Sequence, residues 1–131
     1  MIVLIDARNV LRSRWPNVPA DELVERAESW ARRKRCRAIL VFDGRAPGGL
    51  VGEREANEHL VTVGTGDESA DDWIVSAAVD LAARGERYWL VTSDRAVRRA
   101  AGEAAETTLG GGAFVRELGA ELPRVANSSK G

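Results

Sequence analysis

The sequence predicts an α/β fold, a three-layer sandwich in which helices flank a central, mostly parallel sheet. Short apolar runs with β-branched residues recur along the chain, and such runs are typical of strands covered on both faces. Segments with a helical apolar stripe separate them, and a helix between two parallel strands forms a right-handed crossover. A chain of 131 residues has the length of one domain. We therefore expect one domain over residues 1–126 and a disordered tail or expression remnant over residues 127–131.

Five segments have the composition of strands. The first is an unbroken apolar run that ends in Asp6, and the second and fourth have the sequences AILVF and YWLV. The five predicted strands are residues 1–5, 38–42, 60–63, 88–91 and 107–109. If their order in the sheet is 3-2-1-4-5, the first and fourth strands are neighbours at the point where the winding of the sheet reverses.

Helical patterns account for most of the remaining chain. A helix over residues 20–35 has acidic residues in its first turn and arginines in its last, which complements the helix dipole. Another helix begins after Ser69, which together with Asp72 fits a Ser-x-x-Asp capping box. A shorter helix over residues 95–101 and a last helix around Phe114 complete the fold.

The loops and the tryptophans allow narrower expectations. The segment 45–52 is rich in Gly and Pro, which predicts a mobile loop near the strand ends. Trp30, Trp73 and Trp89 are expected in the core. Trp15 lies in a loop, where it could stack on a base.

The composition is that of a globular protein, with 44% hydrophobic and 30% charged residues. A formal net charge of -1 shows no general basic excess, so any nucleic-acid surface must be local. Cys36 is the single cysteine, which excludes an internal disulfide and a multi-cysteine metal site. No apolar stretch has membrane-spanning length and no signal-peptide pattern precedes the first strand. We therefore expect a cytoplasmic protein with no membrane partner.

Four aspartates are expected at one edge of the sheet. Asp6, Asp43 and Asp94 each follow a strand, and the carboxyl ends of parallel strands form the edge where ligands bind. Asp71 lies at the start of the helix that leads to the fourth strand. On the helical wheel Asp71 falls within the buried arc, toward the sheet, whereas Asp72 falls on the opposite side. Asp71 is therefore the better candidate for a site at this edge.

Such a group of carboxylates predicts a metal site. Carboxylates brought together raise one another's pKa unless a cation offsets their charge, and oxygen ligands suit Mg²⁺ or Mn²⁺. Each residue also has an ordinary interpretation. Asp71 and Asp94 could cap helices, Asp43 with Gly44 could form a plain turn, and Asn9 could stabilise an Asx turn. Capping does not explain why four acids converge, which favours the metal site.

Five segments also match a known family in the family's order and span nearly the whole domain. They are IDARNVL (5–11), VFDG (41–44), ESADDWI (68–74), VTSDRAVRRA (91–100) and FVREL (114–118). With these segments the chain resembles the YacP-like branch of the NYN domains, within the PIN-like nuclease superfamily. ESADD and TSD together are the more specific motifs, because the first motif is shared with other PIN-like proteins. The resemblance implies a central parallel sheet and an acidic ribonuclease site that depends on Mg²⁺ or Mn²⁺.

The resemblance also implies roles for single residues. Asp6, Asp71 and Asp94 would be the catalytic acids that hold the metal. The supporting residues would be Asn9, Asp43, Glu68, Asp72 and Ser93, with Asp72 the less secure member of its pair. The chain departs from the family at Ala7 and Arg8, where Gly and an aromatic residue are common, and in a shortened region between Asp43 and Glu68. These departures concern substrate preference more than the metal site.

The leading hypothesis is a metal-dependent endoribonuclease that hydrolyses phosphodiester bonds in single-stranded or loop RNA. Arginines near the strand-end loops are the candidates for contacts with the RNA backbone, and they are Arg8, Arg12, Arg45, Arg95 and Arg98. The alternative is a non-catalytic RNA-binding module that keeps the PIN-like fold, with Arg8 neutralising a vestigial acidic pocket beside Asp6. A phosphoacceptor signalling domain is disfavoured, because the paired acids that it needs at the first strand are missing. A larger RNA–protein assembly is a candidate partner, and the sequence gives no oligomeric state.

Overall fold

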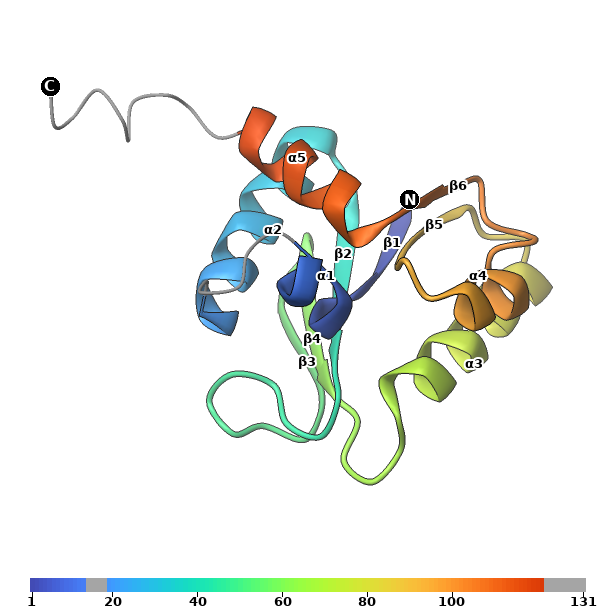
Figure 1. Cartoon of the computed structure of the whole chain (residues 1–131), viewed down its shortest axis with the longest axis horizontal. Helices are drawn as coiled ribbons and strands as arrows, with labels where there is room; N and C mark the ends of the chain where they lie inside the picture. The colour runs from blue at the N-terminus through green and yellow to red at the C-terminus, as the bar shows by residue number, and fades with distance from the viewer. Residues whose placement is uncertain (14–18, 122–131) are drawn as a thin grey trace, which may run out of the picture.

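The computed structural model describes residues 1–13 and 19–121, which form a six-stranded sheet with helices on both faces (Figure 1). The strands are β1 (Ile2–Asp6), β2 (Arg37–Phe42), β3 (Gly52–Asn57), β4 (Leu60–Gly64), β5 (Tyr88–Val91) and β6 (Thr107–Leu109). They lie in the order β3-β4-β2-β1-β5-β6, and all neighbours are parallel except β3 and β4. The five parallel strands therefore follow the predicted order.

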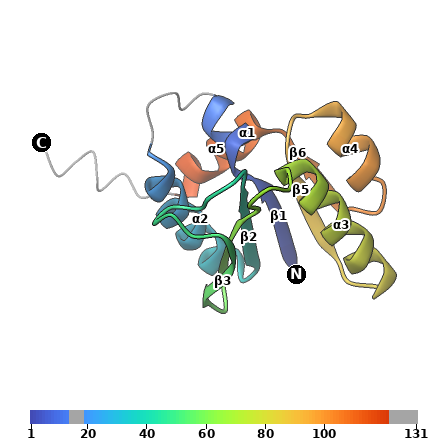
Figure 2. The same ribbon diagram turned by 90° about the horizontal axis from the view of Figure 1, so that it is seen from below.

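Two layers of helices enclose the sheet, as Figure 2 shows from below. The helices are α1 (Ala7–Ser13), α2 (Ala20–Lys34), α3 (Ala70–Ala83), α4 (Arg95–Ala101) and α5 (Gly111–Glu121). Side chains of α1, α2 and α5 share one apolar core with the sheet, and side chains of α3 and α4 share another on the opposite face. In the first core the ring of Trp30 lies 5.1 Å from that of Phe114 in an edge-to-face contact. This arrangement confirms the three-layer α/β fold.

The helix boundaries follow the local signals of the sequence. α2 has Asp21 and Glu22 in its first turn, and it ends where Arg35 adopts a left-handed conformation with a φ of 56°. At the start of α3 the Ser69 hydroxyl oxygen accepts a hydrogen bond from the backbone N–H of Asp72 at 3.0 Å. This bond is one of the two that a capping box contains, and it makes Ser69 the N-cap of α3.

Two elements were absent from the sequence prediction. β3 has the sequence GEREAN, which is charged, exposed and without alternating apolar residues, so its pairing with β4 outweighs its weak strand propensity. α1 has seven residues, too few for a clear helical period. The segment 45–52 also holds more structure than an open loop, because Ala46 is buried and forms a bridge with Leu50.

The tryptophans divide differently from the expectation. Trp30 is buried, whereas Trp73 and Trp89 are only partly buried. The indole N–H of Trp89 donates a hydrogen bond to Glu106, and Trp73 borders an open groove beside α3. Trp73 and Trp89 thus pack at the edges of the two cores rather than inside them, and Trp15 lies outside the described residues.

The predicted tail, residues 127–131, also lies outside the described residues. Within residues 1–13 and 19–121, no helix combines the length and the apolar character that crossing a membrane requires.

Candidate active site

A pocket of about 160 Å³ opens at the carboxyl ends of the parallel strands. Asp6 ends β1, and Asp43 and Asp94 follow β2 and β5, the two strands that are hydrogen-bonded to β1. Asp71 reaches the pocket from the first turn of α3. The lining residues are Asp6, Arg8, Asn9, Arg12, Asp43, Asp71 and Asp94. The structure thus brings together the four aspartates that the sequence places at this edge.

Asp6 is the most enclosed acid of the pocket, with 5% of its surface exposed. Its Oδ1 accepts a hydrogen bond from the backbone N–H of Asn9 at 3.3 Å, and its Oδ2 accepts one from the Thr92 hydroxyl at 3.2 Å. Burial raises the pKa of Asp6 in spite of these bonds, and the charges of Asp71 and Asp43 raise it further. A cation in the pocket would stabilise this carboxylate.

Asp43 holds the start of α3 against the end of β2. Its Oδ1 accepts a hydrogen bond from the backbone N–H of Ala70 at 2.7 Å, and its Oδ2 accepts one from Arg8 at 3.0 Å. The bond from Ala70 and, after it, the Arg8 guanidinium lower the pKa of Asp43, although burial opposes them. Both oxygens of Asp43 therefore have partners in the protein. Because Ala70 precedes Asp71, the bond from Ala70 also fixes the position of Asp71.

Asp71 stands at the rim of the pocket, and its side chain is exposed. Partial desolvation raises its pKa most, and the charges of Asp94, Asp43 and Asp72 raise it further. The expectation that Asp71 lies within the buried arc of the helix needs correction, because its side chain is exposed where the first turn of α3 lies beyond the strand ends. Asp71 still lines the pocket and Asp72 does not, which is the distinction that the helical wheel draws.

Asp94 is the N-cap of α4, and its Oδ1 accepts a hydrogen bond from the backbone N–H of Val97 at 3.1 Å. Capping is therefore a correct interpretation of Asp94. It does not remove Asp94 from the pocket, because this bond engages one of its two carboxylate oxygens. Asp71 has no such role, since the cap of α3 is Ser69.

Thr92 is a site residue that the sequence analysis missed. It is fully buried between β5 and the pocket, and its hydroxyl accepts a hydrogen bond from the backbone N–H of Asp94 at 3.1 Å while donating to Asp6. The available signal was its position in the TSD motif, between a buried strand and an acid. A threonine at a strand end is so common that this signal alone carries little information.

Asn9 connects α1 to the loop between β5 and α4 rather than closing an Asx turn. Its side-chain Oδ1 accepts a hydrogen bond from the backbone N–H of Ser93 at 2.9 Å. The Ser93 hydroxyl in turn accepts one from the backbone N–H of Gly111 at 2.9 Å, which connects α5 to the same network. Ser93 therefore connects α1 and α5 through its hydrogen bonds and does not line the pocket.

Two of the candidate arginines, Arg8 and Arg12, line the pocket from α1. Arg8 is bonded to Asp43, with 55% of its side chain exposed, and Arg12 is also exposed. Both are thus placed to contact a phosphate group of a molecule bound at the acids.

The other three arginines lie outside the pocket lining. Arg45 donates to the carbonyl of Gly49 at 2.9 Å within its own loop, and Arg98 donates through Nε to the carbonyl of Thr92 at 2.8 Å. Arg95 is exposed in the first turn of α4. Among the acids, Glu68 lines the groove on the other side of α3. The hydrogen bonds of Arg45 and Arg98 direct these two side chains to other acceptors, and Arg95 and Glu68 do not line the acidic pocket.

The pocket suits a hard divalent cation in its chemistry. All of its acidic donors are carboxylate oxygens. Burial raises the pKa values of Asp6 and Asp71 most, and the charges of neighbouring acids raise them further, so a cation bound among them would offset both effects. Among the described residues, no three Asp, Glu, His or Cys side chains are already placed to hold one metal ion. Mg²⁺ requires fewer, because it commonly takes one or two carboxylates and completes its shell with water and phosphate oxygens.

The three-layer fold, with acids at the carboxyl ends of its parallel strands, is a PIN-like fold. The chain belongs to the YacP-like NYN domain family, whose sequence profile matches residues 3–130. The crystal structure of Rae1 (YacP) from Bacillus subtilis is similar, with a TM-score of 0.70 and 20% identity over 99% of this chain and 80% of that chain.

A structure of a tryptophan-to-leucine mutant of that Bacillus subtilis protein gives a TM-score of 0.68 and 20% identity. This match covers 97% of the present chain and 79% of the mutant. At this identity the likeness shows the fold. The comparison with curated proteins gave no match.

Proposed function

We propose that this domain is a divalent-metal-dependent endoribonuclease that hydrolyses phosphodiester bonds in single-stranded or loop RNA. The observation that carries the proposal is the convergence of Asp6, Asp43, Asp71 and Asp94 on one small pocket beside two arginines. Asp6, Asp43 and Asp94 each accept a hydrogen bond from a backbone N–H at the start of a helix. Capping does not account for Asp71, and it does not require these helix starts to meet at one pocket. Membership of a nuclease family supports the same reaction class.

In this proposal Asp6, Asp71 and Asp94 hold Mg²⁺ or Mn²⁺. The bound ion supplies Lewis-acid activation of water for in-line attack on the phosphodiester and stabilises charge on the leaving oxygen. Asp43 keeps the first turn of α3, and with it Asp71, at the pocket through its bond to Ala70.

The two arginines of the pocket bind the RNA backbone. Arg8 and Arg12 lie on the same side of α1, four residues apart, and both side chains are exposed. Their guanidinium groups suit the oxygens of adjacent phosphates. Once Arg8 contacts a phosphate, its bond to Asp43 is lost or shared. RNA binding then adds negative charge at the acids, and the metal offsets this charge.

The test is cleavage of a labelled single-stranded RNA by the purified chain with Mn²⁺, with Mg²⁺ and with EDTA. We expect cleavage with either metal, none with EDTA, and a loss of about a hundredfold or more in Asp94→Asn. Asparagine is as good an N-cap as aspartate, so this variant should keep α4, which circular dichroism would verify. Asp21→Asn, an exposed acid in the first turn of α2, is the matched control and should cleave normally.

A non-catalytic RNA-binding module is the second candidate, and the Arg8–Asp43 ion pair at 3.0 Å favours it. The positive charge of the Arg8 guanidinium can replace part of the charge that a metal ion would supply to the acids. RNA binding without cleavage in every metal, unchanged by Asp94→Asn, would select this module. Absence of both binding and cleavage would contradict the two proposals together.

A further inference from the structure

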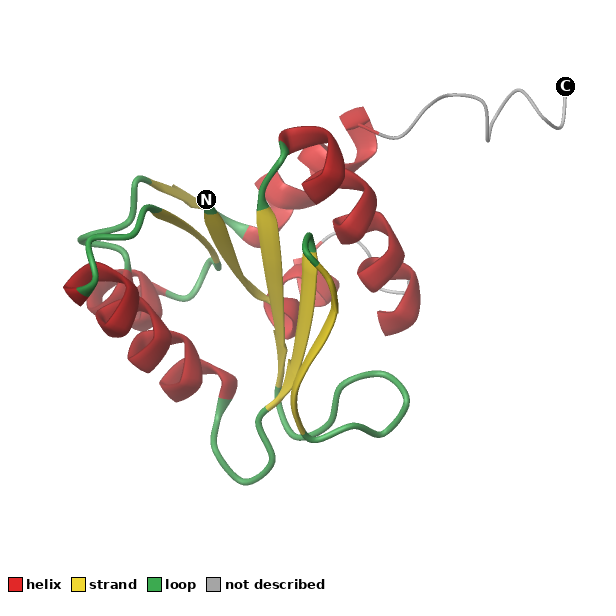
Figure 3. Cartoon of the chain, turned by 180° about the vertical axis from the view of Figure 1, so that it is seen from behind, coloured by secondary structure: helices red, strands yellow, loops and turns green. Residues whose placement is uncertain are grey.

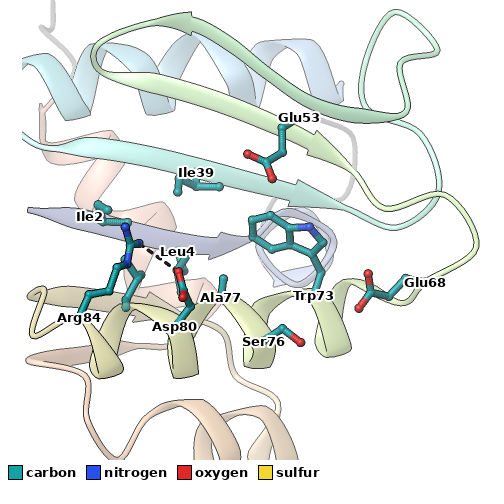
Figure 4. A pocket seen from close by; sticks show the side chains of 11 residues that line it. Ile2, Leu4, Ile39, Glu53, Glu68, Trp73, Ser76, Ala77, Asp80 and Arg84 are labelled. Atoms are coloured by element: carbon teal, nitrogen blue, oxygen red, sulfur yellow. Dashed lines mark ion pairs between the residues drawn. The ribbon is translucent and has the colours of Figure 1, made fainter.

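A second hollow, a groove of about 470 Å³, runs along α3 on the face of the sheet away from α2. We call it the α3 groove. Figure 4 shows its floor of apolar strand residues, its wall on α3 and Glu53 of β3 opposite. The lining residues are Ile2, Leu4, Ile39, Glu53, Glu68, Trp73, Ser76, Ala77, Asp80, Leu81 and Arg84. None of them lines the acidic pocket, so the groove is a separate surface.

The α3 groove exists because helices cover only part of this face of the sheet. α3 and α4 lie toward the β5 side of the sheet in Figure 3, and among the described residues no other helix joins their core. As a result Ile2 and Ile39 remain partly exposed at the edge of that core. Trp73 is partly exposed with them. An aromatic side chain beside an apolar floor is typical of the central part of a protein–protein interface.

The charges at one end of the α3 groove are acidic and uncompensated. Glu53 and Glu68 lie on either side of the Trp73 ring in Figure 4, and both are exposed. Neither forms an ion pair with another described residue, whereas Asp80 at the other end is paired with Arg84 at 3.2 Å. A cation over the face of Trp73 would meet an electron-rich ring and two carboxylates.

We propose that the α3 groove binds a basic segment of a partner protein, with an arginine or lysine side chain on Trp73 between Glu53 and Glu68. Apolar side chains of the same partner segment, next to its cation, pack on Ile2 and Ile39 of the groove. The acids repel phosphate groups, so this end of the groove is unfavourable for RNA. The proposal does not depend on the proposed nuclease activity, because it concerns a separate set of residues.

The position of the groove gives such a partner access to the acidic pocket. Trp73 follows Asp71 by two residues, so the two side chains leave the first turns of α3 in different directions. A segment seated on Trp73 therefore lies across α3 from the acids. A partner bound there is able to bring a substrate to the pocket without covering it.

The test uses a synthetic peptide of alternating leucine and arginine as the probe, titrated into the full chain labelled with ¹⁵N. We expect saturable NMR shifts of the Trp73 indole N–H and of the Ile39 and Glu53 amides. A peptide of the same length with glutamate in place of arginine should leave these signals in place. The double variant Glu53→Gln with Glu68→Gln removes both charges without changing side-chain size, and should bind the arginine peptide about tenfold more weakly.

The matched control is Glu25→Gln with Glu103→Gln, two exposed acids that line neither the groove nor the acidic pocket. This variant has the same net charge as the first but keeps the α3 groove, so it should bind the peptide as the unmodified chain does. Equal weakening in both variants would reduce the effect to net charge and overturn the proposal. Shifts outside the groove, no saturable binding, or a preference of the groove for single-stranded RNA or the glutamate peptide would overturn it as well.

Discussion

Thr92 connects the two acids that end neighbouring strands, because its hydroxyl donates to Asp6 at 3.2 Å and accepts from the backbone N–H of Asp94 at 3.1 Å. A hydroxyl does both through a single oxygen, whereas an ionised carboxylate only accepts and an amide needs two separate atoms in this fully buried position. The Thr92 oxygen therefore links Asp6 to the start of α4, in addition to the pairing of β1 with β5 and the hydrogen bond between Asn9 and Ser93.

Thr92→Val tests this dependence. Valine keeps the shape and the strand preference of threonine but leaves the Asp94 N–H without its acceptor and the Oδ2 of Asp6 without its donor. We expect a loss of about 1–3 kcal/mol in the free energy of unfolding, measured by urea denaturation. Thr92→Ser should recover most of it. Thr62→Val, a partly buried threonine on β4, is the control for the loss of a strand hydroxyl. Equal stability of Thr92→Val and the unmodified chain would show that the bridge is unimportant.

Asp6→Asn should stabilise the metal-free fold at neutral pH. The folded state raises the pKa of Asp6 above its usual 3.8, so the native protein holds this proton more tightly than the unfolded chain. Stability of the unmodified chain therefore falls as pH rises from about 3.8 through the folded-state pKa, and the neutral variant escapes this fall. Asparagine can accept from the Asn9 N–H and donate to Thr92, which preserves both contacts.

The measurement is the midpoint of thermal unfolding for both proteins in EDTA between about pH 3 and pH 8. The variant should gain stability relative to the unmodified chain as pH rises and hold a constant advantage at neutral pH. Addition of Mn²⁺ should stabilise the unmodified chain more than the variant, since a bound cation offsets the ionised carboxylate. A variant that is less stable in EDTA at neutral pH would contradict the burial argument.

Most of the fold could be predicted because it repeats a simple pattern. β1, β2 and β5 are short apolar runs that fit a buried strand better than a helix or a loop. The acid that follows each run, Asp6, Asp43 or Asp94, marks the edge of the sheet where the three acids lie. β3 could not be predicted, because its stability comes from backbone pairing with a strand that follows it in sequence. The side chains of β3 have no apolar pattern from which this pairing could be predicted.

The arginines show the limit of reasoning from loop proximity. A long side chain can turn toward whichever acceptor is nearest, and Arg98 turns to the carbonyl of Thr92 while Arg45 turns to that of Gly49. Glu68 precedes Asp71 by three residues but lines the opposite side of α3. Helical geometry separates Asp71 from Asp72 correctly, because the direction of a side chain on a helix is set by the backbone. No comparable rule applies to Glu68, which comes before the helix.

Arg8→Ala should increase the affinity of the pocket for Mn²⁺ severalfold. The Arg8 guanidinium lies 3.0 Å from Asp43 and adds to the Ala70 hydrogen bond in lowering the pKa of that carboxyl. It also opposes the burial and the neighbouring acids that raise the pKa of Asp71, so it competes with a metal ion for the same negative charge. The fold should change little, by at most about 1 kcal/mol, because the ion pair is exposed. Isothermal titration with Mn²⁺ measures the affinity, with Arg45→Ala as the control for a lost arginine in a nearby loop. Unchanged or weaker Mn²⁺ binding in Arg8→Ala alone would contradict the competition.

Asp71→Asn and Asp72→Asn form the sharpest comparison that the chain offers. The two residues are adjacent in the first turn of α3, both are exposed, and each variant removes one negative charge near the helix N-terminus. Their effects on helix stability should therefore be similar, at about 0.3–1 kcal/mol. Of the two residues, Asp71 lines the pocket and Asp72 does not.

If the pocket is a metal-dependent nuclease site, Asp71→Asn should lower the cleavage rate at saturating RNA by about a hundredfold or more. Asp72→Asn should stay within about threefold, since its charge acts on the pocket only through solvent. Higher Mn²⁺ concentration should restore part of the activity of Asp71→Asn, because the lost ligand weakens metal binding. Equal losses in the two variants would show that the charge of the helix start matters and that the direction of Asp71 does not.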